Sequence, residues 1–224
     1  MKELKIINFK SKPKNNFFAP EWDYYICENI VKNIDCKSLA KFLLSKEKQI
    51  VKLKPTFNLK HNTYTDGFTG LGVNTTTARF RAFNVLNFKH KEISKLKKQI
   101  IETYNMFLKA LNLNPPKQLY AQCWYNVMRK GDQIKPHIHG YSPDAYLGGH
   151  FCVQCDDTST YYINPVNQIN DPETYKSLNE EGKLTLFQNC IPHYTDKQNS
   201  NLERITIAFD LEYTDIQNNF VKLF

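Results

Sequence analysis

Three histidines and one arginine, in the order His137, His139, His193 and Arg204, are the residues of this chain whose types and spacing could do chemistry. Side chains alternate faces along an extended strand, so the imidazoles of His137 and His139 would point to the same side. Imidazole suits iron, zinc, copper and nickel, and a third histidine would complete one face of an octahedron while leaving positions open for substrate or dioxygen. His193 follows the β-type run 182–187 and is the natural third ligand. An H-x-H pair alone is more often chance surface sequence, so the metal interpretation depends on the other features.

The run from Arg204 to Leu211 predicts a strand with two different faces. One face reads Arg, Thr, Ala, Asp and the other reads Ile, Ile, Phe, Leu. The apolar face should pack on a core or on covering helices, while Arg204 and Thr206 should face a polar interior. A guanidinium can bind a carboxylate bidentately and a nearby hydroxyl can add a hydrogen bond, so a dicarboxylate would fit there. The alternative is an edge-strand arginine that faces solvent.

An ordered set of short motifs resembles the Fe(II)/2-oxoglutarate-dependent oxygenases, and within them the prolyl-hydroxylase-like oxygenases of bacteria and bacteriophages. The resemblance is strong from about Tyr120 to Leu211 and loose in the N-terminal half, where it rests on Thr65-Asp66-Gly67 and a long helix. The motifs are Trp124-Tyr125-Asn126, Gly131-Asp132-Gln133, His137-Ile138-His139, the run 148–153 (GGHFCV), the run 182–187 (GKLTLF), Pro192-His193 and Arg204-Ile205-Thr206.

This resemblance implies a mainly β fold with flanking helices (α+β), built on a double-stranded β-helix, the jelly-roll core that cupins also have. We expect residues 1–224 to form a single oxygenase domain. Residues 1–118 would supply an N-terminal extension and supporting helices, and residues 119–213 the core strands with the metal site near the open mouth. The length of the chain allows one domain with a substantial core.

The resemblance also implies roles for individual residues. His137 and His193 match the two histidines of the family, which bind Fe(II). Arg204 matches the basic residue that pairs with the distal carboxylate of 2-oxoglutarate, and Thr206 matches the hydroxyl residue two positions later. Asn126 resembles a polar residue that can reach the cosubstrate.

The sequence departs from the best-known family pattern at position 139. Most members have H-x-Asp or H-x-Glu, so His139 replaces a carboxylate ligand and leaves the metal with one more positive charge. Three interpretations stay open: His139 is the third ligand, Asp144 in the following loop supplies a carboxylate, or the protein has kept the fold and lost catalysis. We favour the first.

The implied function is an enzyme that hydroxylates a C–H bond with Fe(II), 2-oxoglutarate and dioxygen, releasing succinate and carbon dioxide. A peptidyl side chain is the favoured substrate, although relatives with the same core act on free amino acids, nucleobases and small metabolites. Two other classes remain. One is a three-histidine cupin-like dioxygenase that needs no 2-oxoglutarate, and the other is a catalytically silent basic binding module.

Charge and hydropathy limit the kinds of partner and the cellular location that we expect. The chain has 30 Lys and Arg against 22 Asp and Glu, and the basic residues are spread, with several in residues 1–16. Nucleic acid is a possible partner but is not favoured, because no arginine cluster, zinc finger or aromatic RNA-binding motif is present. No run approaches the roughly 18 apolar residues of a membrane span. We therefore expect no membrane partner and a cytoplasmic protein, in the host cytoplasm if a phage encodes it.

The elements that must position these residues can be outlined from periodicity and turn signals. The pattern predicts a helix over 36–44 with Asp35 as its N-cap, a helix over 91–111, a strand over 119–128, a loop over 65–81 that could be a lid over the barrel mouth, and a second long loop over 164–181.

Overall fold

The computed structural model describes all residues except 1–3, 12–17, 19, 141–145, 167–172 and 215–218. Its helices are α1 (Cys36–Val51) and α2 (Lys91–Ala110), with short 3-10 helices η1 (Thr77–Arg79) and η2 (Val85–Asn87). Its strands are β1 (Lys5–Lys10), β2 (Asp23–Ile30), β3 (Phe57–Asn58), β4 (Thr63–Tyr64), β5 (Tyr120–Met128), β6 (Leu147–Gln154), β7 (Ser159–Ile163), β8 (Thr174–Leu178), β9 (Lys183–Gln188), β10 (His193–Thr195), β11 (Arg204–Glu212) and β12 (Val221–Lys222).

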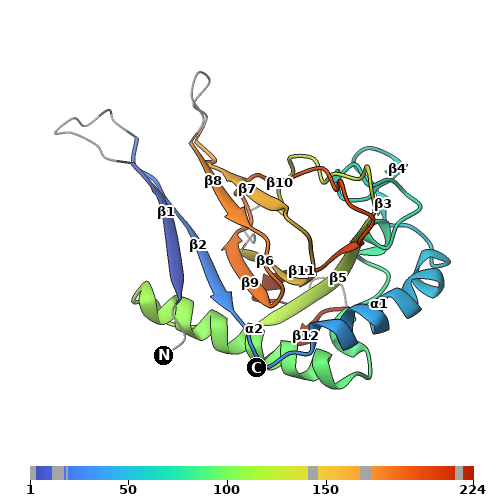
Figure 1. The fold of residues 1–224 in the computed structure, drawn as a ribbon. Helices are drawn as coiled ribbons and strands as arrows, with labels where there is room; N and C mark the ends of the chain where they lie inside the picture. Colours follow the sequence, from blue (N-terminus) through green and yellow to red (C-terminus); the bar gives the residue numbers. More distant parts are fainter. Residues whose placement is uncertain (1–3, 12–17, 19, 141–145, 167–172, 215–218) are drawn as a thin grey trace.

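Two antiparallel sheets form the core. The larger sheet has the order β1-β2-β9-β6-β11-β5-β12, and the smaller has the order β10-β7-β8. The extended segment around His137 joins the smaller sheet through one bridge to His193. From β5 onward the chain alternates between the two sheets. It leaves β5 in the larger sheet for the His137 segment beside the smaller one, and returns to the larger sheet at β6. It then forms β7 and β8 in the smaller sheet, β9 in the larger, β10 in the smaller and β11 in the larger. This connectivity is a double-stranded β-helix, so the predicted jelly-roll with flanking helices is confirmed (Figure 1).

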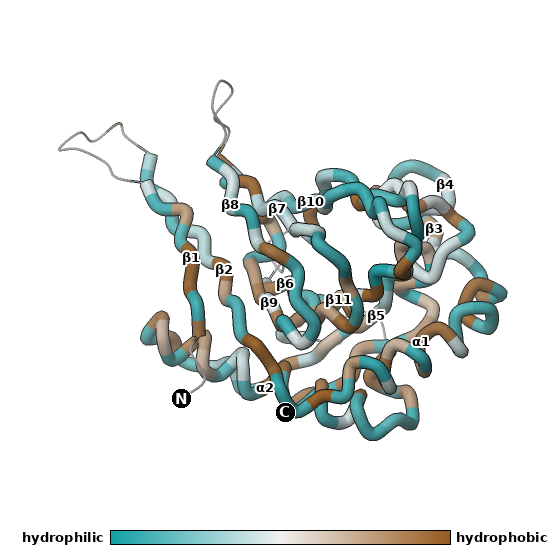
Figure 2. Tube along the Cα trace, in the orientation of Figure 1, coloured by the Kyte–Doolittle hydropathy of each residue, from teal (hydrophilic) through white to brown (hydrophobic). Residues whose placement is uncertain are grey.

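The two helices lie along one side of the larger sheet (Figure 1). Asp35 caps α1 as predicted, since its side chain accepts a hydrogen bond from the Ser38 N–H at 3.0 Å, but the helix continues to Val51. The second helix spans nearly the predicted residues. Both helices alternate hydrophobic and hydrophilic residues in Figure 2, and their buried residues join the main hydrophobic core.

Strand β11 sits between β6 and β5 and has the two faces that its sequence predicts. Its apolar residues are fully buried in the core that the helices cover. Arg204, Thr206, Ala208 and Asp210 line a cavity on the opposite face, between the two sheets. The arginine is only 2% exposed, which rules out the alternative of an edge-strand arginine facing solvent.

Two predictions about local structure are wrong. The loop predicted over 164–181 contains β8, whose residues pair with β7 at the edge of the smaller sheet. The H-x-H segment is not a regular strand, because only His137 makes a β-bridge. The segment 65–81 lacks regular strands, as expected, and its residues 65–69 line the same cavity, while the prediction that it moves as a lid stays a prediction.

The centre of the larger sheet gives a test of this packing. A Cβ at Gly149 would meet the Phe209 ring and would lie 2.7 Å from the carbonyl oxygen of Thr185. Gly149→Ala should therefore lower the free energy of unfolding by about 1–3 kcal/mol, measured by urea denaturation. Adding Phe209→Leu should restore part of the loss, and an unchanged stability of the single variant would contradict this packing.

Candidate metal centre

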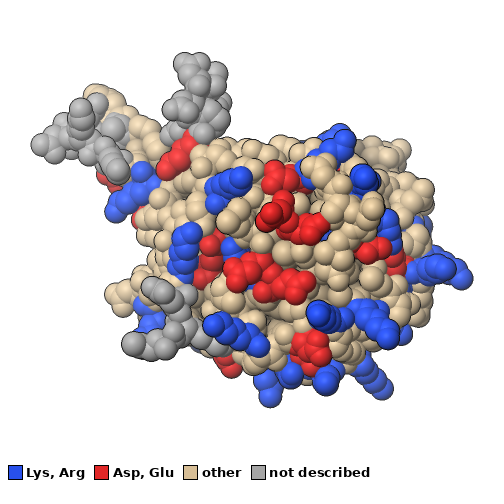
Figure 3. Space-filling model, viewed as in Figure 1, with Lys and Arg blue, Asp and Glu red and all other residues tan. Residues whose placement is uncertain are grey.

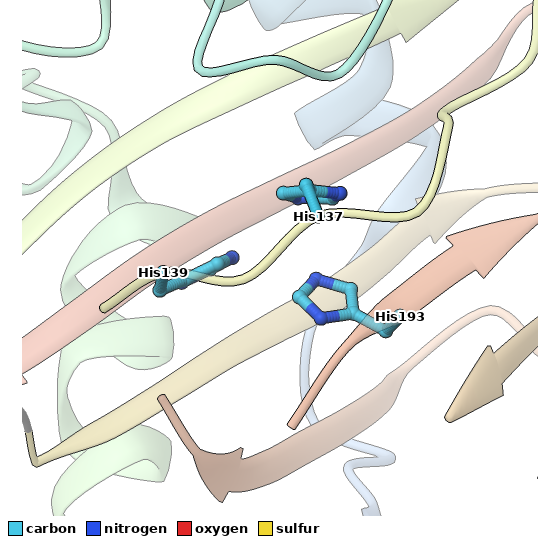
Figure 4. A group of neighbouring side chains, drawn as sticks. All are labelled: His137, His139 and His193. Carbon is cyan, nitrogen blue, oxygen red and sulfur yellow. The ribbon is translucent and has the colours of Figure 1, made fainter. Parts of the chain in front are cut away.

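The three predicted histidines come together in one cluster. Each offers a ring nitrogen, and these nitrogens lie within 4.8 Å of one another, so one cation can contact all three. His137 and His139 project from the same extended segment and His193 reaches toward them from β10 (Figure 4). The backbones of His137 and His193 exchange two hydrogen bonds, of 3.2 and 3.0 Å, which hold the two segments in register.

The hydrogen bonds behind the rings indicate which nitrogen is available to a metal. The Nδ1 atoms of His137 and His193 lie 2.9 and 3.1 Å from the carbonyl oxygens of Lys135 and Ile191. The Nδ1 of His139 lies 2.6 Å from a carboxylate oxygen of Asp210. Because these partners only accept, each Nδ1 must carry the hydrogen, and each Nε2 keeps a free lone pair. Three such lone pairs are a donor set that fits Fe(II).

Burial keeps two of these imidazoles neutral. It lowers the pKa of His137 to about 4, with the neighbouring His139 as a second cause. It lowers the pKa of His193 well below the ordinary value, and both other histidines of the cluster act in the same direction. A neutral imidazole is the form that binds a metal, so the cluster is ready for a cation at neutral pH.

Arg204 is a buried cation at the wall of the same cavity. Its Nη2 donates to Thr160 Oγ1 and Asn179 Oδ1, both at 3.1 Å, while its Nε is buried and makes no hydrogen bond. Among the residues that the structure describes, no carboxylate lies within ion-pair distance of this guanidinium. Burial lowers its pKa from the usual value. A buried charge without a counter-charge is costly, so the site favours binding of an anion.

Thr206 and Asn126 lie side by side on β11 and β5, where they are paired in register. Asn126 Nδ2 donates to Thr206 Oγ1 at 3.3 Å, and Asn126 Oδ1 accepts a hydrogen bond from the hydroxyl of Thr77 at 2.8 Å. Both side chains line the cavity that contains the histidines and Arg204. The structure thus brings all six predicted site residues to one cavity. The alternative ligand Asp144 lies outside the described residues.

Several polar residues of the cavity received no predicted role, and two of them bear on the candidate site. One is Asp210, behind His139. The other is His150 on β6, whose Nε2 lies 2.6 Å from the hydroxyl of Tyr162 and whose Nδ1 is buried without a partner. Burial, with the positive charge of Arg204, lowers the pKa of His150 to about 3. His150 stands in the motif 148–153, but only the strand register shows that it faces the cavity.

The cavity has a volume of about 600 Å³, which exceeds the needs of a small diacid alone. Aromatic side chains of Trp124 and Phe187 lie against His139, with ring centroids 5.6 and 5.3 Å away. Phe57 and Phe68 also belong to the lining and are 38% and 59% exposed. The lining therefore runs from buried polar groups to exposed apolar ones, where a larger molecule could enter.

The charged residues bear on the possible partners. Lys and Arg are scattered over the face shown in Figure 3, and Asp and Glu gather near its centre. Nucleic acid as an unfavoured partner stays a prediction. Within the described part of the chain, neither helix is long and apolar enough to cross a membrane.

Comparison with known proteins finds a family model that is similar to the core of this chain. Residues 122–210 match the model of the family described as "Putative 2OG-Fe(II) oxygenase". The matched segment runs from β5 to β11 and contains every predicted site residue. The resemblance to the 2-oxoglutarate/Fe(II) oxygenases is confirmed by this match, which covers the strands from β5 to β11. No curated protein sequence matches the chain.

Solved structures of low sequence identity resemble the chain as well. A Pseudomonas putida prolyl-4-hydroxylase is 11% identical, with a TM-score of 0.44 over 57% of this chain and 68% of the other. A 2OG-Fe(II) oxygenase family oxidoreductase from Burkholderia pseudomallei is 12% identical, with a TM-score of 0.41 over 97% and 77%. A viral collagen prolyl hydroxylase from Paramecium bursaria Chlorella virus 1 is 9% identical, with a TM-score of 0.42 over 57% and 78%.

The buried histidines predict how stability depends on pH. The folded pKa values of His137 and His150 lie near 4 and 3, below the ordinary 6.5, so the unfolded chain binds more protons as the pH falls below 6.5. The free energy of unfolding of the metal-free protein should therefore fall between pH 6.5 and about 4, by at most about 1.4 kcal/mol per pH unit for each histidine. Urea denaturation across this range measures it.

His150→Gln provides the comparison for this prediction. It removes one of the shifted groups without touching the three clustered histidines, so its stability should decline less steeply as the pH falls. A stability that stays constant from pH 7 to 4.5 in the parent protein would contradict the burial of these imidazoles.

Proposed function

We propose that this protein is an Fe(II)- and 2-oxoglutarate-dependent dioxygenase that hydroxylates a C–H bond. The observation that supports it best is the buried guanidinium of Arg204, without a carboxylate partner among the described residues, in the same cavity as three clustered imidazoles. A cation site and an anion site in one cavity suit a diacid that chelates a metal at one end and pairs with arginine at the other.

His137, His139 and His193 would hold the iron through Nε2, because their Nδ1 atoms are held by acceptors. Iron supplies dioxygen activation when it is bound, and the balanced reaction is substrate C–H plus dioxygen plus 2-oxoglutarate giving substrate C–OH, succinate and carbon dioxide. The protein orients the reactants and keeps the site dry.

Arg204 would bind the distal carboxylate of 2-oxoglutarate, and the buried Nε and the Nη groups supply its donors. Thr206 lies two residues along the same strand face and would add a hydroxyl, with Asn126 holding that hydroxyl in place. The unpartnered Nδ1 of His150 is a further polar group of this cavity. The low pKa of His150 means that it would act as a neutral hydrogen-bonding group there.

For the substrate we propose only a chemical class. A peptidyl side chain is favoured, and the exposed apolar residues Phe57, Leu59 and Phe68 support entry of an apolar group carried by a larger molecule. Succinate formation measured with and without proline-containing or mixed peptides would test it. Stimulation by small metabolites and by no peptide would contradict it.

One observation favours the alternative, a three-histidine cupin-like dioxygenase that needs no 2-oxoglutarate: the ligand cluster found among the described residues contains three histidines and no carboxylate. Arg204 discriminates between the two by experiment: replacing it should abolish 2-oxoglutarate binding under the first proposal, and should leave turnover without 2-oxoglutarate under the second. A catalytically silent protein would bind neither iron nor 2-oxoglutarate in this cavity.

Anaerobic titration tests the cosubstrate. Fe(II) protein should develop a weak visible charge-transfer band when 2-oxoglutarate is added. Arg204→Met should raise the Kd of 2-oxoglutarate roughly 100-fold or more, because breaking a buried ionic pair on one side costs about 3–5 kcal/mol, and should leave Fe(II) binding intact. Arg129→Met, which removes a surface arginine paired with Glu47, is the matched control. No band with metal-loaded protein would contradict the proposal.

Arg204→Met also shows whether the guanidinium serves ligand binding or the stability of the fold. Removal of a buried cation without a counter-charge should leave the metal-free protein as stable as the parent or more stable in urea. A large loss of stability in Arg204→Met would mean that the guanidinium serves the fold.

The metal ligands can be tested one by one. His193→Ala should abolish Fe(II) binding measured by calorimetry, because the remaining two imidazoles cannot hold the ion tightly. His61→Ala changes an exposed histidine and is the control. Retained stoichiometric binding in His193→Ala would show that the ion lies elsewhere.

A further inference from the structure

His139 stands where most members of the resembling family carry a carboxylate, and the fold brings a carboxylate to it from another strand. Asp210 lies near the end of the polar face of β11, and its Oδ1 is 2.6 Å from the Nδ1 of His139. The other two histidines of the cluster donate to neutral backbone carbonyls. Asp210 is thus the charged partner directly behind the cluster.

The space around this pair is shaped by a glycine. Gly148 of β6 is paired in register with Asp210, and a Cβ at position 148 would lie 2.8 Å from the Nδ1 of His139. The same Cβ would lie 2.9 Å from the ring of Phe187. A side chain at position 148 would therefore push the imidazole away from its carboxylate.

The remaining contacts fix the imidazole in one orientation. The Trp124 and Phe187 rings pack against it, with ring centroids 5.6 and 5.3 Å away, and the backbone N–H of His139 donates to the carbonyl of Asn189 at 3.0 Å. The His139 side chain is 6% exposed and that of Asp210 is 23% exposed. With its backbone and Nδ1 held and two aromatic rings packed against it, the ring presents its Nε2 to the other two histidines.

We propose that Asp210 is the positioning residue for the metal ligand His139, and that it supplies from β11 the negative charge that H-x-Asp members place on the metal itself. The inference rests on the proposed function, because it needs an ion at the histidine cluster. Three neutral imidazoles and a divalent ion carry two positive charges, and the carboxylate one hydrogen bond away reduces this to one. An acceptor on Nδ1 also makes Nε2 a stronger donor to the metal.

A variant at position 210 tests the role in metal binding. Asp210→Asn keeps the shape and an acceptor oxygen but removes the charge, so the affinities for Co(II) and anaerobic Fe(II), measured by calorimetry, should fall roughly 10- to 100-fold. The visible spectrum of the Co(II) protein should shift as well, since the donor strength of one ligand changes. Circular dichroism and urea denaturation check that the variant is folded.

Asp66→Asn is the matched control for charge. Asp66 lines the same cavity, and its carboxylate accepts hydrogen bonds from the Gly72 N–H at 2.7 Å and from the Thr69 hydroxyl at 3.1 Å. It removes the same unit of charge without touching a histidine of the cluster. An equal loss of affinity in Asp66→Asn and Asp210→Asn would show that only the general charge of the cavity matters, and would overturn the positioning role.

A measurement on the unaltered protein keeps the inference testable if the variant fails to fold. In protein labelled with nitrogen-15 histidine and loaded with Zn(II), His139 should carry its proton on Nδ1 and bind through Nε2, with its signal assigned by its loss in His139→Gln. Coordination of Zn(II) through Nδ1, or a proton on Nε2, would overturn the proposal.

Failure of the proposed function and failure of the role of Asp210 give different results. If the parent protein binds neither Co(II) nor Fe(II), the proposed function fails. If the parent binds the ions and 2-oxoglutarate while Asp210→Asn binds metal equally well with the same spectrum, only the role of Asp210 fails.

Discussion

The antiparallel bridge between His137 and His193 is the constraint on which the candidate centre depends. Two segments that are far apart in the chain exchange a pair of backbone hydrogen bonds there, and the ring centroids of the two histidines come within 4.3 Å. His139 follows two residues later on the same side, and β10 continues into the pairing with β7 that places Thr160 beside Arg204. The Thr195 N–H, which donates to the Ile134 carbonyl at 3.1 Å, and the His139 N–H, which donates to the Asn189 carbonyl at 3.0 Å, hold the same segment on either side of this bridge.

Electrostatics explain why such an arrangement would be retained. The interior between the sheets holds a guanidinium without a carboxylate in ion-pair distance among the described residues, and histidines whose pKa values are lowered by burial. In the metal-free protein the unpaired guanidinium costs folding free energy, and the histidines cost it as the pH falls below about 6.5. A divalent cation and a diacid would offset both costs, because the imidazoles gain a Lewis acid and the guanidinium gains a counter-charge. The polar groups of this cavity would therefore contribute more to ligand binding than to the stability of the metal-free protein.

Much of this could be predicted from the sequence, for identifiable reasons. The alternation in β11 is readable because side chains follow a period of two, and it separates the cavity face from the core face without other information. The helices were recognisable from their apolar spacing and, for α1, from Asp35. Strand β8 was missed because Thr174 to Leu178 is polar and lies at a sheet edge. The roles of Asp210 and His150 were missed because they arise from cross-strand register, which brings Asp210 beside Gly148 and His139 and leaves His150 against Tyr162.

A crystal structure of the protein with Fe(II) and 2-oxoglutarate, grown without oxygen, would test the central claim most directly. We expect one ion bound by the Nε2 atoms of His137, His139 and His193, with the keto-acid end of 2-oxoglutarate on the ion and its distal carboxylate on Arg204. An ion held by other residues, or a carboxylate in place of His139, would contradict the assigned ligand set. A 2-oxoglutarate molecule that avoids Arg204 would contradict the assigned function.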